Sequence, residues 1–308
     1  MRWSWTSIAF GTTLVALAIL INGCGKSTTA PNPPQSSDAA EVASTLVAAA
    51  TLVDDGLAVD STQVNAERLS PAPGIASIQA AIRPFTWWQR ITGVARTWSF
   101  AWSDTDATAH PKFCVATLTE HLTGTLVIVP ASPSDSTRAD TTRILKPIDK
   151  TLTRKVMLQR LALGLDREWR VIAVTGALVT TPGAITRIVS LRIRSASGVD
   201  TTLTDPLQWM SLRHIIQFGV NDSVTVTVTT VRADNPVYIH RWDWRHRLRN
   251  NLDDTYSFTW VTSAWSGFRH FGIQAMSHGS IYDDKLPFDM MAWHLPFRVT
   301  QTGVDYYP

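Results

Sequence analysis

Tryptophan, histidine and arginine alternate along residues 237–247. If this stretch is one extended strand, Trp242 and Trp244 lie on one face and Arg241 and Arg245 on the other, because side chains alternate with a period of two. Exposed indole rings stack on sugar rings or on prolines, whereas buried ones fill a core and need a partner for the N–H. We therefore take these four residues as a candidate ligand-binding surface, with core packing as the alternative.

Three aspartates near a turn could hold a cation, namely Asp283, Asp284 and Asp289. Carboxylate oxygens are preferred ligands of calcium. Aspartates are also common in turns, so solvated turn residues are the alternative. His240 and His246 are the closest suggestive histidine pair, but six residues of strand span about 20 Å, too far to share one metal.

Catalytic motifs are missing from the sequence. No two glycines lie four apart, so the G-x-S-x-G elbow of hydrolases is absent, and neither H-E-x-x-H nor C-x-x-C occurs. Glutamate is scarce, which leaves few candidates for a glycosidase carboxylate pair. The sequence predicts a protein that is not an enzyme and binds no cofactor. The alternative is a hydrolase with its site in a cavity of the N-terminal domain.

The segment Gly25-Lys26-Ser27-Thr28 matches the end of a phosphate-binding loop, G-x-x-x-x-G-K-[ST]. The first glycine of that motif would fall on Leu20, however. Residues 31–34 include three prolines, so the helix that must follow the loop cannot form. We reject a phosphate-binding loop on these two grounds.

A lipid attachment site fits the same region better. Arg2 precedes an apolar run from Ile8 to Ile21, which ends in Asn22-Gly23-Cys24. This order resembles the lipobox of bacterial lipoproteins, which implies lipidation of Cys24, removal of residues 1–23 and anchoring at the outer membrane. An uncleaved anchor is the alternative, although the run of about 14 residues is shorter than the roughly 20 that span a bilayer. A plain secretory signal is the other alternative.

Composition limits the possible functions. Hydrophobic residues make up 44% and charged residues 17%, as in a globular protein. The net charge of +3 is too small to indicate a nucleic-acid partner. Basic residues outnumber acidic ones along residues 138–170, which we interpret as a solvated face. Cys114 has no disulfide partner if Cys24 is acylated, and its apolar surroundings predict a buried, unreactive thiol.

The N-terminal half predicts an α+β fold. After a tether at 24–37, apolar residues recur every three or four positions along 38–53, and a weaker helical pattern covers 57–69. Strands with a period of two follow from about residue 85, including 113–121 and 125–129 joined by a turn. Helices followed by a curved antiparallel sheet resemble the NTF2-like superfamily, which implies a cone-shaped domain over 38–197.

The C-terminal part, residues 198–308, is almost entirely strand-like. Residues 223–231 (SVTVTVTTV) alternate valine and threonine, and 256–260, 268–276 and 293–300 follow as further strands. Short strands over about 100 residues resemble an immunoglobulin-like β-sandwich. Pro296 predicts that the last strand lies at a sheet edge.

We therefore predict a lipid-anchored protein of the bacterial cell envelope with a binding or structural role. Its expected partners are the membrane, through the anchor, and a surface glycan, a cell-wall peptide or another envelope protein.

Overall fold

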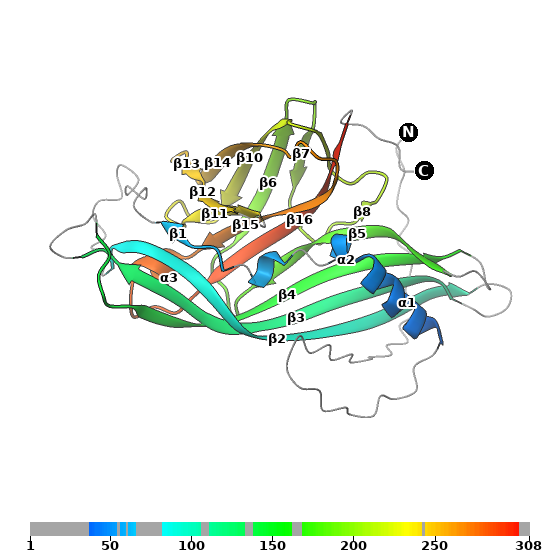
Figure 1. Cartoon of the computed structure of the whole chain (residues 1–308), viewed down its shortest axis with the longest axis horizontal. Helices are drawn as coiled ribbons and strands as arrows, with labels where there is room; N and C mark the ends of the chain where they lie inside the picture. The colour runs from blue at the N-terminus through cyan, green and yellow to red at the C-terminus, as the bar shows by residue number, and fades with distance from the viewer. Residues whose placement is uncertain are drawn as a thin grey trace.

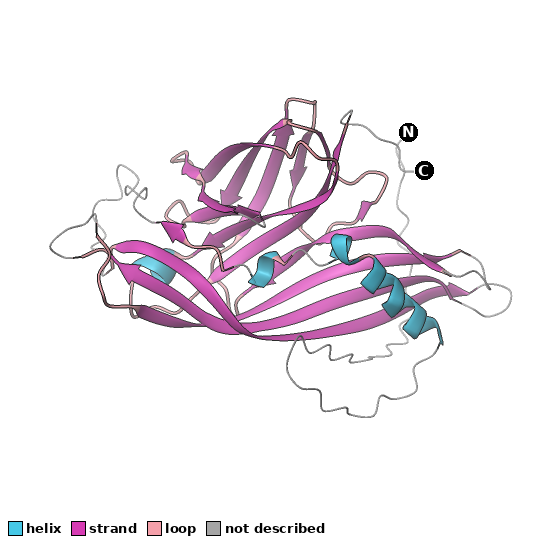
Figure 2. Ribbon diagram, in the orientation of Figure 1, coloured by secondary structure: helices cyan, strands magenta, loops and turns pink. Residues whose placement is uncertain are grey.

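A computed structural model describes residues 37–53, 56–59, 61–65, 82–105, 111–132, 138–161, 168–241 and 244–301. Cys24, the predicted signal peptide and the predicted tether lie outside these residues. These residues are mostly β, with 61% in strands and 10% in helices. Figure 1 and Figure 2 show a large curled antiparallel sheet that carries a smaller sheet over part of one face and short helices beside it.

Within the described residues, the large sheet has 11 strands and the small sheet has five. The order in the large sheet is β1-β2-β3-β4-β5-β16-β15-β11-β12, with β8 paired to β5 and β9 paired in parallel to β16. The order in the small sheet is β13-β14-β10-β6-β7. β5 pairs directly with β16, so strands from the C-terminal half continue the sheet that begins in the N-terminal half.

The elements have the following bounds. The strands of the large sheet are β1 (Val64–Asn65), β2 (Pro84–Thr105), β3 (Pro111–Pro130), β4 (Ile144–Arg160), β5 (Trp169–Thr180), β8 (Met210–Ser211), β9 (Gln217–Gly219), β11 (Val237–Arg241), β12 (Trp244–Arg247), β15 (Gly267–Met276) and β16 (Met290–Thr300). The strands of the small sheet are β6 (Ile188–Ser195), β7 (Asp200–Leu203), β10 (Ser223–Thr230), β13 (Arg249–Asn250) and β14 (Thr255–Val261). The helices are α1 (Ser37–Ala48), α2 (Ala50–Val53), α3 (His278–Tyr282) and the 3-10 turn η1 (Leu57–Val59).

Four long strands, β2 to β5, form the curled part of the large sheet. Their side chains alternate between faces, and the inner face is covered by α1 and α2. Val42 and Leu46 of α1 are buried against this face, as their helical spacing predicts. Trp98 and Cys114 are also buried there, and burial raises the pKa of the Cys114 thiol, which fits the predicted unreactive cysteine.

The predicted fold class, an α+β domain with N-terminal helices followed by an immunoglobulin-like sandwich, is wrong. The described chain is mostly strand, and only α1 is longer than a turn and a half. The helix predicted over 57–69 is replaced by η1 and β1 where the chain is described. Apolar residues spaced by three or four over such a short stretch also occur in turns that pack on a sheet, so this pattern does not distinguish a helix from turns.

The two sheets pack face to face as a β-sandwich. β10 lies between β6 and β14, and its inward side chains Val224, Val226 and Val228 are fully buried. They meet inward residues of β15 and β16, among them Phe271 and Leu295, in a second hydrophobic core. The valine–threonine alternation therefore predicted this strand and its buried face correctly.

Two details of the predicted strands are wrong. The strands predicted at 113–121 and 125–129 form one strand, β3, which runs through Gly124 without turning. Pro296 lies in a central strand rather than at an edge. Pro296 pairs with His270 of β15 on one side. On its other side, β16 pairs with β5 up to His294 and with β9 from Arg298, so Pro296 lies in the gap between these two pairings. No partner strand there needs a hydrogen bond from the proline nitrogen.

Candidate functional site

The stretch predicted as one strand over 237–247 is a hairpin. β11 and β12 pair antiparallel, with Arg241 opposite Trp244 and His240 opposite Arg245. Residues opposite each other in a hairpin share a face, so the alternation shifts by one position across this turn. Arg241 therefore shares a face with Trp244, whereas a single strand would have placed it with Arg245. Trp242 lies outside the described residues.

The hairpin brings Trp244 beside a ring from the other sheet. Its indole centroid lies 5.8 Å from Phe258 of β14 and 5.0 Å from His246. His246 stacks on Phe258 at 5.5 Å with an interplanar angle of 18°. The guanidinium of Arg241 lies over the indole at 5.6 Å. We call Arg241, Trp244, His246 and Phe258 the edge aromatic cluster, because they meet where the outer strand β12 of the large sheet faces β14 of the small sheet.

The edge aromatic cluster is partly open to solvent. His246 is exposed, and Arg241, Trp244 and Phe258 are half-buried. Trp244 and Phe258 pack one side of their rings against the sandwich core. Partly exposed, mutually supported rings are held in fixed orientations at little entropic cost, which suits them for stacking on a ligand.

Arg245, the fourth residue predicted for this surface, lies on the opposite face of the hairpin. It is 7% exposed, and its guanidinium lies over the ring of Trp87 at 5.2 Å. His240 shares that face and contacts His294 at 5.2 Å between ring centroids, so His240 and His246 point to opposite sides. The structure thus brings together Arg241 and Trp244 and separates Arg245 from them.

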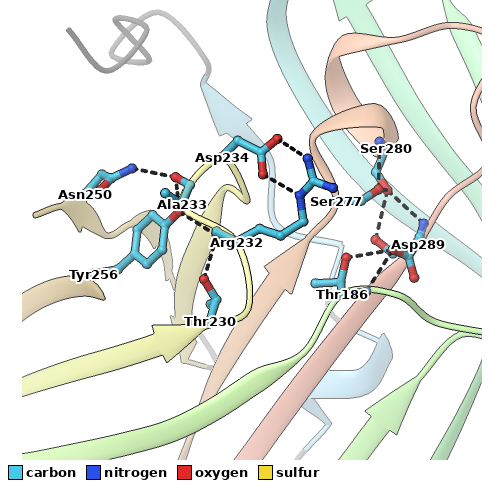
Figure 3. Close-up of polar contacts among 10 residues, drawn as sticks. All are labelled: Thr186, Thr230, Arg232, Ala233, Asp234, Asn250, Tyr256, Ser277, Ser280 and Asp289. Carbon is cyan, nitrogen blue, oxygen red and sulfur yellow. Dashed lines mark hydrogen bonds and ion pairs between the residues drawn. The ribbon is translucent and has the colours of Figure 1, made fainter. Parts of the chain in front are cut away.

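The three aspartates predicted as a calcium site, Asp283, Asp284 and Asp289, do not bring their carboxylate oxygens within 4.8 Å of one another. The carboxylate of Asp289 accepts hydrogen bonds from the Thr186 hydroxyl at 2.6 Å and from the Thr181 hydroxyl at 3.2 Å. Figure 3 shows Asp289 between Thr186 and Ser280. The Ser280 hydroxyl accepts a hydrogen bond from the backbone N–H of Asp289 at 2.8 Å. Asp283 accepts from the backbone N–H of Lys285 at 2.8 Å. These contacts fix the loop around α3.

A network in the same region braces the turn between β10 and β11 (Figure 3). Arg232 forms a two-pronged ion pair with Asp234 at 2.9 and 3.0 Å, which lowers the pKa of that carboxyl. Asn250 and Tyr256 donate to the carbonyl of Ala233. Burial raises the pKa of Tyr256 to about 12, so this phenol remains a donor at neutral pH. The turn crosses from the small sheet to the large one, and the network therefore fixes where the β11–β12 hairpin begins.

In the described part of the chain, Asp38, Glu41 and Glu168 form the one group of three possible metal ligands whose oxygens all lie within 4.8 Å of one another. Arg160 already lies among them, paired with Asp38 and, at 3.4 Å, with Glu168. The network ties α1 to β4 and to the start of β5. Burial and the neighbouring charges of Glu168 and Asp38 raise the pKa of Glu41.

Replacing Glu41 with glutamine is expected to stabilise the protein at pH 7 but not at pH 4. A carboxyl whose pKa is raised in the folded state stabilises the fold at pH values below its ordinary pKa of 4.5. That stabilisation is lost as the pH rises through the folded-state pKa, so at pH 7 a neutral glutamine is favoured over the charged glutamate. Because Glu41 is only half-buried, the gain is below about 1 kcal/mol, or roughly 1–3 °C in Tm. Thermal unfolding of both proteins at the two pH values measures it. A lower Tm for E41Q at pH 7 would show instead that Arg160 or the helix N-terminus favours the charge.

The basic stretch 138–170, predicted as a solvated face, is partly buried. Lys146, Lys150 and Arg154 point inward from β4 and are at most 3% exposed. Lys146 donates to the carbonyls of Gly279 and Asp283 around α3, and Lys150 donates to Gln89 at 2.7 Å. Burial lowers the pKa of Lys146 to about 8. These cations hold surrounding segments on the inner face of the sheet.

Comparison with known proteins identifies no relative: no protein-family profile, no curated protein and no solved structure matches the chain. Among the described residues, no helix has the length and apolar character needed to cross a bilayer.

Proposed function

We propose that this protein is a lipid-anchored component of the bacterial cell envelope that binds a glycan through the edge aromatic cluster. The observation that carries the binding role is the contact of Trp244, His246 and Phe258 at a partly open edge of the sandwich, with Arg241 over the indole. Sugar rings present flat arrays of C–H groups to aromatic faces, and a guanidinium donates hydrogen bonds to hydroxyl groups. The proposed anchor rests on the lipobox resemblance at Cys24 and on the apolar run before it.

The ionisable groups on the inner face of the large sheet contact other groups of the protein, which favours a binding role over catalysis. Lys146, Lys150 and Arg154 donate to oxygens of the protein, and Glu120 pairs with Arg96. These contacts join strands and helices. The aromatic cluster, in contrast, presents ring faces at the surface.

Replacing Trp244 with alanine is expected to weaken glycan binding by about 10- to 100-fold, because tryptophan is a typical hot-spot residue. Purified full-length protein in detergent is mixed with insoluble cell-wall sacculi, and the bound fraction is measured after sedimentation. Sacculi stripped of their stem peptides by an amidase should retain the protein equally well. Retention only on sacculi with peptides would indicate a peptide ligand and overturn the glycan proposal.

Trp265 supplies the matched control. It is 77% exposed and lies outside the edge aromatic cluster, so W265A should leave binding unchanged. Equal losses for W244A and W265A, or no loss for W244A, would show that the cluster is not the binding surface. The anchor is tested separately by the mass of the native N-terminus. A free thiol at Cys24 or an intact leader would contradict lipidation.

A further inference from the structure

β2 forms one side of the large sheet and is a strand of 22 residues. β3 pairs with it along almost its whole length, whereas β1 pairs with its other side only at Thr86 and Trp87. Beyond Trp87, no other strand of the described chain pairs with that side, and Figure 1 shows β2 at the margin of the sheet. An open edge of this kind is a template for another extended strand.

The sequence of this edge is nearly symmetric about Phe100. Residues 97–103 read Thr-Trp-Ser-Phe-Ala-Trp-Ser. In an antiparallel pair centred on Phe100, residues equally far from it on the two strands lie opposite each other. Trp98 then faces Trp102 of a second copy, and small residues face small ones at 99 and 101.

Burial and spacing suit such a pairing. Positions 96, 98, 100 and 102 share one face of the strand, because side chains alternate. On that face, the ring centroid of Trp102 lies 6.0 Å from that of Phe100 and 5.6 Å from that of Trp169. On the opposite face, Ser99 and Ala101 are small, uncharged and half-buried. Proline and lysine, which natural edges use to block pairing, are absent from residues 88–105.

We propose that two copies of this chain associate through β2, antiparallel and centred on Phe100, so that their large sheets join into one. Aromatic residues opposite each other stabilise antiparallel pairs. The two-fold symmetry of the sequence points to a second copy rather than to a different protein.

Disulfide trapping tests the register. Two differently tagged full-length chains, one with Ser99→Cys and one with Ala101→Cys, are co-expressed and treated with an oxidant in intact cells. The proposal predicts a reducible dimer that carries both tags. The matched control uses Thr153→Cys and Lys155→Cys. These residues lie two apart on the same face of the interior strand β4, and their variants should give no disulfide-linked dimer. The native chain, with Cys24 and Cys114, gives the background.

A second variant tests the affinity without cysteine chemistry. Ser99→Lys with Ala101→Lys places lysines opposite lysines, and like charges that face each other across a strand pair are destabilising. We expect the dissociation constant, from analytical ultracentrifugation of the full chain in detergent, to rise at least about 100-fold with an unchanged circular dichroism spectrum. A native chain that stays monomeric, a trapped product with another protein, or equal trapping in the β4 control would overturn the proposal.

Discussion

Replacing Arg154 with alanine is expected to destabilise the protein by about 3 kcal/mol and to loosen the helical segment 37–53. The side chain is 1% exposed and donates to the carbonyl of Val53, the last residue of α2. A cation at the C-terminus of a helix binds the carbonyls that lack a partner within the helix and opposes the negative end of the dipole. Alanine would leave that carbonyl buried without this donor and would open a cavity.

Lys155→Ala is the control for this prediction. Lys155 follows Arg154 in β4 but points to the other face of the sheet, where it is half-exposed, so its loss should change stability by no more than about 0.5 kcal/mol. Urea unfolding measures both variants, and limited proteolysis reports cleavage within 37–53. Arg154→Met separates charge from volume: if R154M is as stable as the native protein, packing rather than the hydrogen bond to Val53 holds the segment.

The spacing of the basic residues in β4 contains a signal for their burial. Lys146, Lys150 and Arg154 are separated by four, so on a strand they share a face. Ile148 and Leu152 lie between them at even positions and belong to the same face, which is the core face. A count of charges along a segment ignores this alternation, and for that reason it predicts a solvated segment here.

The hydrophobic pattern along the sequence predicts several strands correctly. It fails where the structure depends on which strands meet. The alternation of 223–231 needs only the period of one strand. The edge aromatic cluster requires Phe258 of β14 to meet Trp244 of β12, and these residues belong to different sheets. No spacing along the chain specifies such a contact, so sequence reasoning found Arg241 and Trp244 but missed Phe258. His246 lies two residues after Trp244 in the same strand, so the period of two already places these two rings on one face.

Replacing Gly124 with alanine is expected to destabilise the protein by about 3 kcal/mol and to lower the Tm by roughly 6–12 °C. The sequence suggested a turn at this glycine, but the structure shows a close approach of two strands. The pairing of β2 with β3 shifts between Ile91 and Gly93, and this irregularity presses β2 against Gly124. A Cβ here would lie 2.2 Å from the carbonyl oxygen of Arg90 and 2.8 Å from the Cα of Ile91. Both are backbone atoms, so the strands themselves must separate.

Gly93→Ala, in the same irregular region, is the matched comparison. Its Cβ would lie 2.5 Å from the Thr123 hydroxyl, a side-chain atom that can rotate away, so we expect a loss of only about 1 kcal/mol. Thr123→Ala should then rescue G93A but leave G124A as unstable as before. Thermal unfolding of five variants, namely G93A, G124A, T123A and the two double variants, completes both cycles. If G124A unfolds at the native temperature, β2 and β3 can separate here at little cost. The curl of the large sheet would then depend on the helices packed on its inner face rather than on this contact between strands.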